Sequence, residues 1–123
     1  MKRFLVVGLL ALVAIAATAC GGAASAPKSK GDTAKGKTVF ASSCSACHGA
    51  DAKGLPGLGK DMTTSSFIKG LNEDQFLDFL KKGRPASDPA NTTKVDMPPK
   101  GGNTSLTDQD MYDVIAYIRS LVK

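Results

Sequence analysis

Two stretches of the chain place hydrophobic residues at helical spacing and carry their own start and stop signals. In the first, residues 71–83, Asn72 can cap the start, Gln75 stands at the capping-box position, and Gly83 follows two lysines at the end. One apolar face comes from residues at positions i, i+3 and i+4: Phe76, Phe79 and Leu80. The pattern predicts an amphipathic helix that packs against a core.

The second stretch closes the chain and predicts the longest helix. Thr107 can cap its start, and Asp110 stands three residues later at the capping-box position. Arg119 and Lys123 lie near the C-terminal end, where positive charge stabilises a helix. Its apolar positions again follow helical spacing: Met111, Val114, Ile115, Ile118 and Val122.

Weaker helical signals precede these two stretches. Asp32 can cap a helix that carries Phe40 and runs into a pair of cysteines. Residues 61–70 predict a short helical turn with Phe67 and Ile68 inside.

Glycines and prolines predict loops over residues 49–60 and 83–104. The second loop is long for a compact domain, and such loops are usually functional or disordered. Near its end Met97 is followed by Pro98 and Pro99, which fix φ and stiffen the backbone. Every regular element that these patterns predict is helical.

The first nineteen residues have the pattern of an export signal. Lys2 and Arg3 precede an apolar run over residues 4–17, and small residues follow up to Ala19. The run would form a helix of about 21 Å, shorter than the roughly 30 Å hydrocarbon core of a bilayer. We therefore expect cleavage after Ala19. The chain's net charge of +5, which cleavage lowers, is modest and does not call for nucleic acid.

Cys20 would then begin the mature chain. Residues 17–20 resemble the lipobox of bacterial lipoproteins, in which this cysteine carries a lipid, although Ala17 stands where Leu is usual. The alternative is ordinary cleavage that leaves a free thiol. Residues 21–31 contain no large apolar residue and predict a flexible tether. The expected organisation is a signal peptide over 1–19, an anchor cysteine and linker over 20–31, and one domain over 32–123, located in the periplasm or on the outer face of the cytoplasmic membrane.

The most specific motif is a pair of cysteines followed directly by a histidine. Cys44 and Cys47 are three positions apart, and His48 comes next. This spacing attaches c-type haem, because both thiols can reach its two vinyl groups while the histidine faces the iron. We therefore expect one haem c, bound covalently through Cys44 and Cys47, with His48 as an iron ligand.

Three other uses of the cysteine pair remain open. A thioredoxin-like redox couple expects a βαβ context, which the flanking residues do not predict. A zinc site needs about four ligands, and no further Cys or His stands nearby. A structural disulfide is the third alternative.

A second iron ligand has to come from another residue type, because His48 is the chain's only histidine. Methionine is the usual choice, and Met111 belongs to the apolar face of the last helix. Met62 and Met97 remain. We favour Met97, which stands on a proline-stiffened loop beyond a whole helix; Met62, closer to His48, would line the pocket.

The loop over residues 49–60 is expected to contact the haem. A liganding histidine usually donates its second ring N–H to a carbonyl or a carboxylate, and a carbonyl near Pro56 is the expected acceptor for His48. Leu55 and Leu58 are apolar residues in a polar loop, so we expect them to be buried against the haem, with a small separate core as the alternative.

The cysteine and histidine motif, Met97-Pro98-Pro99 and the closing residues 113–121 resemble the small single-haem class I cytochromes c of bacteria, over residues 32–123. The resemblance implies an all-α fold class, the cytochrome c fold: three to five helices around one haem, with the first and last helices crossing beside it. It also implies His48 and Met97 as axial ligands and Pro56 as the source of the carbonyl bonded to His48.

The same resemblance implies that Gly36 and Phe40 pack against Tyr117 at the helix crossing. It makes Arg84 a candidate partner for a haem propionate, with a solvated arginine as the alternative. Lysines near the expected haem could steer an acidic partner, unless they are simply a scattered solvated surface: Lys53, Lys60, Lys81, Lys82, Lys94 and Lys100.

The function that the resemblance implies is one-electron transfer outside the cytoplasm, in a respiratory or photosynthetic chain, with redox proteins or a membrane respiratory complex as partners. One alternative is a fixed haem subunit of a larger membrane oxidoreductase. Another is an enzyme or gas sensor in which Met97 does not bind and the iron keeps an open position.

Overall fold

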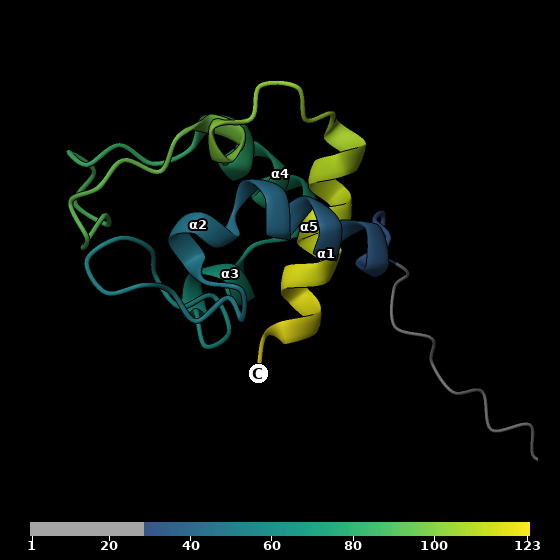
Figure 1. Cartoon of the computed structure of the whole chain (residues 1–123), viewed down its shortest axis with the longest axis horizontal. Helices are drawn as coiled ribbons and strands as arrows, with labels where there is room; N and C mark the ends of the chain where they lie inside the picture. The colour runs from purple at the N-terminus through teal and green to yellow at the C-terminus, as the bar shows by residue number, and fades with distance from the viewer. Residues whose placement is uncertain (1–28) are drawn as a thin grey trace, which may run out of the picture.

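Six short helical segments make up the computed structural model, which describes residues 29–123 (Figure 1). They are α1 (Thr33–Ser43), α2 (Ser45–His48), α3 (Ser66–Gly70), α4 (Glu73–Lys82), the 3-10 turn η1 (Pro99–Gly102) and α5 (Asp108–Leu121). The expected signal peptide, Cys20 and the linker up to residue 28 lie outside the described residues.

Over residues 29–123 the chain forms no strand, only two isolated β-bridges, which confirms the all-α fold class. Within the same residues no helix has the length and apolar character needed to cross a membrane.

Local capping sets the ends of the helices. Asp32 begins α1 because its carboxylate accepts hydrogen bonds from the second and third amides of the helix. A capping box formed by Asn72 and Gln75 begins α4, and another, formed by Thr107 and Asp110, begins α5. All three predicted starts are therefore confirmed.

Helices α1 and α5 cross at close range (Figure 1). A Cβ atom on Gly36 would lie 1.9 Å from the carbonyl oxygen of Asp113, so no side chain fits at that position. One turn later the rings of Phe40 and Tyr117 meet with their centroids 5.4 Å apart. The crossing that the resemblance implied is confirmed, down to these residues.

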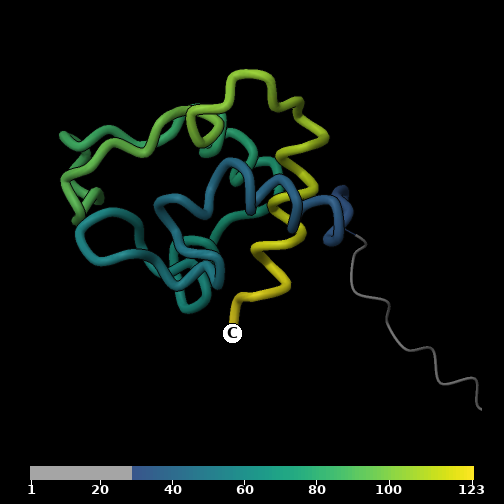
Figure 2. The backbone as a smooth tube through the Cα atoms, viewed as in Figure 1, coloured from purple at the N-terminus to yellow at the C-terminus, as the bar shows by residue number. Residues whose placement is uncertain are grey.

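The core lies where α4 and α5 face each other and extends toward the loops. It contains residues from all four longer segments, among them Phe40, Ile68, Phe76, Leu80 and Ile115. Figure 2 shows the loop after α2 and the loop after α4 lying together on one side, opposite the first residues of α1. These two loops position the site.

Three apolar residues are more exposed than the sequence indicated. The expectation that Phe67 lies inside is wrong: it is 41% exposed, while Ile68 beside it is 5% exposed. Leu55 and Leu58 are 41% and 37% exposed. Phe67 and Leu58 line the cavity described next, so their packing depends on what fills it, whereas Leu55 belongs to the exposed turn over residues 55–59 and does not line the cavity.

Candidate haem site

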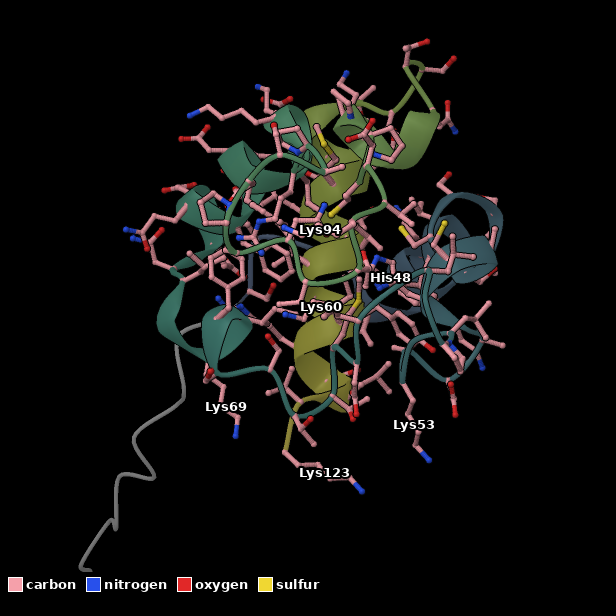
Figure 3. The ribbon with its side chains drawn as sticks, turned by 90° about the vertical axis from the view of Figure 1, so that its left-hand side faces the viewer. His48, Lys53, Lys60, Lys69, Lys94 and Lys123 are labelled. Carbon is pink, nitrogen blue, oxygen red and sulfur yellow. The ribbon has the colours of Figure 1, made fainter. Side chains whose placement is uncertain are left out.

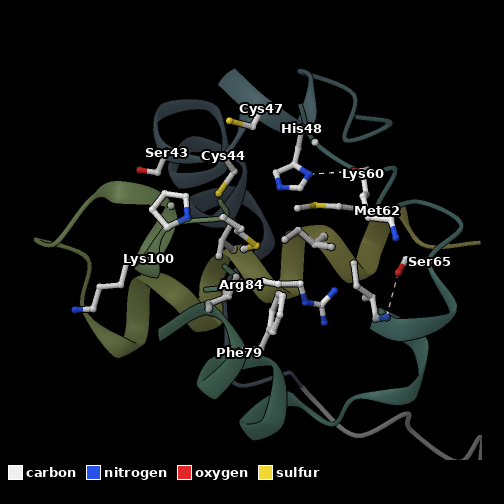
Figure 4. A pocket seen from close by; sticks show the side chains of 18 of the residues that line it. Ser43, Cys44, Cys47, His48, Lys60, Met62, Ser65, Phe79, Arg84 and Lys100 are labelled. Atoms are coloured by element: carbon white, nitrogen blue, oxygen red, sulfur yellow. Dashed lines mark hydrogen bonds between the residues drawn. The ribbon is translucent and has the colours of Figure 1, made fainter. Parts of the chain in front are cut away.

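A mostly apolar cavity opens between the two loops and reaches down to α5 (Figure 4). Cys44, Cys47 and His48 line one part of it, and Met97 lines another. Its floor consists of core side chains from α4 and α5: Phe76, Phe79, Leu80, Met111, Val114 and Ile118. The structure thus brings the predicted thiols, the histidine and the favoured methionine into one cavity.

The two cysteines are presented by a sharp change of direction between helices. Cys44 ends α1, where its amide donates to the Phe40 carbonyl, and then begins the single turn of α2. The amide of His48 donates to the Cys44 carbonyl over 3.0 Å, which closes this turn. Both thiols are free and both line the cavity.

The alternatives to haem attachment find no support in this geometry. Burial, with a smaller effect of Cys47, raises the pKa of the Cys44 thiol to about 11, whereas a redox-active cysteine pair relies on a lowered thiol pKa. The described residues contain no cluster of three or more His, Cys, Asp or Glu side chains that could hold a metal ion such as zinc. The free thiols form no disulfide in the structure.

His48 is oriented by one hydrogen bond, from its Nδ1 to the backbone carbonyl of Lys60 over 3.0 Å (Figure 4). A carbonyl oxygen can only accept, so the proton is on Nδ1 and the lone pair of Nε2 is left to bind a metal. A carbonyl in this position also fixes the ring plane and increases the basicity of the ligand.

The assignment of this carbonyl to Pro56 is therefore wrong. Residues 55–59 form a tight turn of their own, closed by a bridge between Leu55 and Gly59, which leaves Pro56 exposed at its tip and outside the cavity. Gly59 then packs on α2 so closely that a Cβ there would lie 2.2 Å from the Cys47 carbonyl oxygen. This close approach delivers the next carbonyl, that of Lys60, to His48. Leu58 does line the cavity, as predicted.

Met62 lies on the same side of the cavity as His48. It follows Lys60 by two residues, and its amide donates to the Ala52 carbonyl over 2.8 Å. Figure 4 shows its side chain beside the His48 ring, and it is only 6% exposed. In this position Met62 lines the cavity beside His48 and does not stand opposite the histidine ring.

Met97 is held by a backbone bridge to Arg84. The Met97 amide donates to the Arg84 carbonyl over 2.9 Å, and the Arg84 amide donates to the Met97 carbonyl over 2.8 Å. In Figure 4 Arg84 lies across the cavity from His48. The bridge therefore holds the backbone of Met97 on a different wall from Met62.

The guanidinium of Arg84 lines the cavity and lies against two aromatic rings that also contact each other. Its central carbon lies 4.5 Å from the ring centroid of Phe67 and 4.8 Å from that of Phe79. Its buried Nε has no hydrogen-bond partner, although a carboxylate oxygen of Asp88 stands 3.4 Å away. A stacked guanidinium with a free donor suits the carboxylate of a haem propionate.

Two contributors to the site gave little signal in the sequence. The Lys60 carbonyl is a backbone group, so residue type does not reveal it. Asn91 is 4% exposed and lines the cavity, but an asparagine in a loop of this composition is ordinary. Only its burial shows that it matters.

The six predicted lysines differ in their surroundings. Lys53, Lys60 and Lys94 lie on the same face as His48 (Figure 3), although Lys53 stands 3.8 Å from a carboxylate oxygen of Asp51. Lys81 forms an ion pair with Asp108, the ammonium group of Lys100 donates to the Leu106 carbonyl, and Lys82 is exposed.

Several features together fit a covalently bound haem: two free thiols at the spacing of a thioether pair, a histidine with Nε2 available, apolar walls, and an arginine whose buried Nε makes no hydrogen bond. An all-helical domain built around such a site belongs to the class of c-type cytochromes.

Comparison with known proteins defines the family. The cytochrome c family model matches residues 33–122, and the chain therefore belongs to the cytochrome c family. It is 33% identical to cytochrome c-555 of Prosthecochloris aestuarii over 71% of this chain and 85% of that protein. It is 34% identical to cytochrome c-555 of Chlorobaculum thiosulfatiphilum over 71% of this chain and 93% of that protein. The protein is a c-type cytochrome that functions in electron transfer and binds one haem c covalently through Cys44 and Cys47.

Two further matches cover less of the matched proteins. The cbb3-type cytochrome c oxidase subunit FixP of Bradyrhizobium sp. is 36% identical over 53% of this chain and only 23% of its own length. Cytochrome cL from Methylophaga aminisulfidivorans superimposes with a TM-score of 0.55 at 22% identity, over 73% of this chain and 53% of that one. This second likeness confirms the fold.

Proposed function

We propose that the chain is a tethered carrier of single electrons outside the cytoplasm, with His48 and Met97 as the two axial ligands of its haem iron. The observation that carries this proposal is that both residues line one cavity from separate elements, each fixed by backbone hydrogen bonds. An iron whose two axial positions are both filled by protein side chains has no position free for a substrate, which favours electron transfer over chemistry on a bound substrate.

The chain's own residues would keep the site unchanged during transfer. When bound, the haem iron supplies a one-electron change of oxidation state. The Lys60 carbonyl holds the His48 ring in place, and the bridge to Arg84 holds Met97. Core side chains such as Phe76, Met111 and Val114 exclude water from the buried part of the ring. Little has to move, which keeps the reorganisation on electron transfer small.

Carbon monoxide tests whether the iron site is closed. We expect the reduced full-length protein to show no spectral change on brief exposure to carbon monoxide, because Met97 occupies the sixth position. The Met97→Ala variant, which opens that position, should bind it readily. Rapid uptake by the parent protein would contradict the proposal and favour the enzyme or gas-sensor alternative.

We place the carrier at a membrane surface through a lipid on Cys20, a residue outside the described part of the chain. The support is the lipobox-like sequence of residues 17–20 and the apolar run before it. Fractionation of the native host tests this assignment: the parent protein should sediment with membranes and leave them only with detergent, and Cys20→Ser should be released in soluble form with its haem intact. A Cys20→Ser protein that stays on the membrane would overturn the anchor.

A fixed haem subunit of a membrane complex is the second candidate, favoured by the likeness to the FixP subunit of a cbb3-type oxidase. Mild detergent extraction separates the two functions. A carrier should elute as a small monomer, and a subunit should remain with a large assembly under the same conditions.

An acidic redox partner suits the face that carries His48. Lys60 and Lys94 lie on that face, as does Lys53 beside Asp51 (Figure 3), and positive charge accelerates encounter with a negative surface. The rate of electron transfer to the partner should therefore fall as ionic strength rises. A rate independent of salt would contradict this docking mode.

A further inference from the structure

Asn91 is the most enclosed polar residue of the loop between Arg84 and Met97. It is 4% exposed and lines the haem cavity. The loop itself is otherwise mostly exposed, and no regular helix or strand holds it together. A buried polar side chain in such a segment has to be fully hydrogen bonded to be tolerated.

The side chain of Asn91 ties both arms of this loop to each other. Its Nδ2 group donates to the carbonyls of Pro85 over 3.1 Å and Val95 over 2.7 Å, with the Arg84 carbonyl a longer contact at 3.4 Å. Arg84 and Pro85 stand at the start of the loop, whereas Val95 stands near its end. One amide therefore joins the two arms.

The oxygen of the same amide holds the turn between the arms. Oδ1 accepts from the Thr93 hydroxyl over 3.0 Å and from the Lys94 amide over 3.1 Å. Lys94 has a φ of +58°, an unfavourable conformation for a lysine that this hydrogen bond helps to hold. Every donor and acceptor position of the amide is used.

The bonded segment ends at Met97. Arg84, whose carbonyl contacts the Asn91 amide, exchanges both backbone hydrogen bonds with Met97. The Asp96 carboxylate also accepts from the Ala86 amide and adds a second tie between the arms. Removing the Asn91 amide would remove the hydrogen bonds to the Pro85 and Val95 carbonyls that tie the two arms together close to this bridge, and the loop would open more easily.

We infer that Asn91 is a positioning residue that keeps the 85–96 loop closed and thereby holds Met97 on the iron against competing ligands. The inference rests on the proposed function, in which Met97 is an axial ligand. Asn91 then determines how readily Met97 leaves the sixth coordination position of the haem iron.

Imidazole binding to the oxidised, haem-loaded protein tests the inference. Imidazole has to displace Met97, so its affinity reports how easily the loop opens. We expect Asn91→Ala to raise that affinity by roughly tenfold or more, because the hydrogen bonds that tie the two arms of the loop together are lost. Asn91→Asp should also raise the affinity for imidazole. It keeps Oδ1, but it replaces the donor Nδ2 with a carboxylate oxygen that repels the nearby carbonyl oxygens. Hydrogen exchange at the Met97 amide should accelerate in both variants.

Two controls separate positioning from general destabilisation. Thr92→Ala changes an exposed neighbour whose side chain takes part in none of the hydrogen bonds seen over residues 29–123, and it should leave imidazole affinity unchanged. Leu77→Ala removes a core side chain of α4 that does not line the cavity, so it should lower the unfolding temperature with little change in imidazole affinity.

The outcomes distinguish this inference from the proposed function. If Met97→Ala binds imidazole more tightly than the parent but the Asn91 variants do not, the role of Asn91 is overturned and the ligand assignment stands. If Met97→Ala has the affinity of the parent, the ligand assignment fails and the inference fails with it. If Leu77→Ala matches Asn91→Ala, Asn91 acts only through stability.

Discussion

Gly36 is a single residue on which the crossing of α1 and α5 depends. A Cβ atom there would overlap the Asp113 carbonyl oxygen at 1.9 Å and lie 3.0 Å from the Cβ of Tyr117. Gly36→Ala should gain about 1 kcal/mol in helix propensity, but overpacking of this kind typically costs about 1 to 3 kcal/mol. We expect a net loss of stability in denaturant unfolding of the haem-loaded protein.

Gly70→Ala is the matched control for this prediction. Gly70 also lies in a helix, and an added Cβ would meet no atom within 4 Å. Equal effects of the two substitutions on the free energy of unfolding would show that the crossing does not require glycine at position 36.

Among single residues, the sequence predicted the side chains of the haem site better than its backbone groups. Cys44, Cys47 and His48 follow from their spacing alone, and elimination together with two prolines singled out Met97, which lines the same cavity. The carbonyl on His48 did not follow, because any residue supplies one. The carbonyl that accepts from His48 is selected by the turn at residues 55–59 and by the contact of Gly59 with α2. Neither feature can be recognised from the types of residue in the sequence.

The capping box at the start of α5 makes the stability of the fold depend on pH. The Thr107 side chain accepts from the Asp110 amide, and the Asp110 carboxylate accepts from both the amide and the hydroxyl of Thr107. These hydrogen bonds, the one from the Thr107 side chain first, lower the pKa of Asp110 below its ordinary 3.8. A carboxyl with a depressed pKa stabilises the fold above its unfolded pKa and loses that contribution as pH falls through the folded pKa.

Thr107→Ala should therefore destabilise the protein most at neutral pH, by about 1 kcal/mol, the usual effect of removing an N-cap side chain. The difference in unfolding temperature from the parent should shrink as pH falls below the ordinary pKa of 3.8 and through the lower pKa of Asp110 in the folded protein. Thr104→Ala, an exposed threonine outside the capping box, is the control. A difference that stays constant from pH 7 to acid would show that the charged capping box contributes nothing.

Helices with strong local signals were predictable as elements, and loop conformation was not. The starts at Asp32, Asn72 and Thr107 follow from caps that act over three or four residues. The bridge between Arg84 and Met97 joins residues thirteen apart in a stretch whose prolines indicated only irregular structure. Contacts of that range depend on the folded molecule.

For the molecule as a whole, the haem is part of the core. The cavity that holds the two thiols is lined by core side chains of α4 and α5, and a domain of this size buries little other apolar surface. We expect the Cys44→Ala, Cys47→Ala double variant not to accumulate as a folded protein, judged by yield and circular dichroism. Cys20→Ser, which leaves the haem site intact, should fold normally. A helical, cooperatively folding double variant would contradict this account.

Ligation of the iron by His48 and Met97 is the central claim, and the optical spectrum of the oxidised protein tests it most directly. A methionine sulfur on ferric haem produces a weak charge-transfer band at the red end of the visible spectrum. We expect the band in the parent protein, its loss in Met97→Ala and its retention in Met62→Ala, because Met62 lies on the histidine side of the cavity. A band that is absent from the parent, or that disappears in Met62→Ala alone, would contradict the assignment.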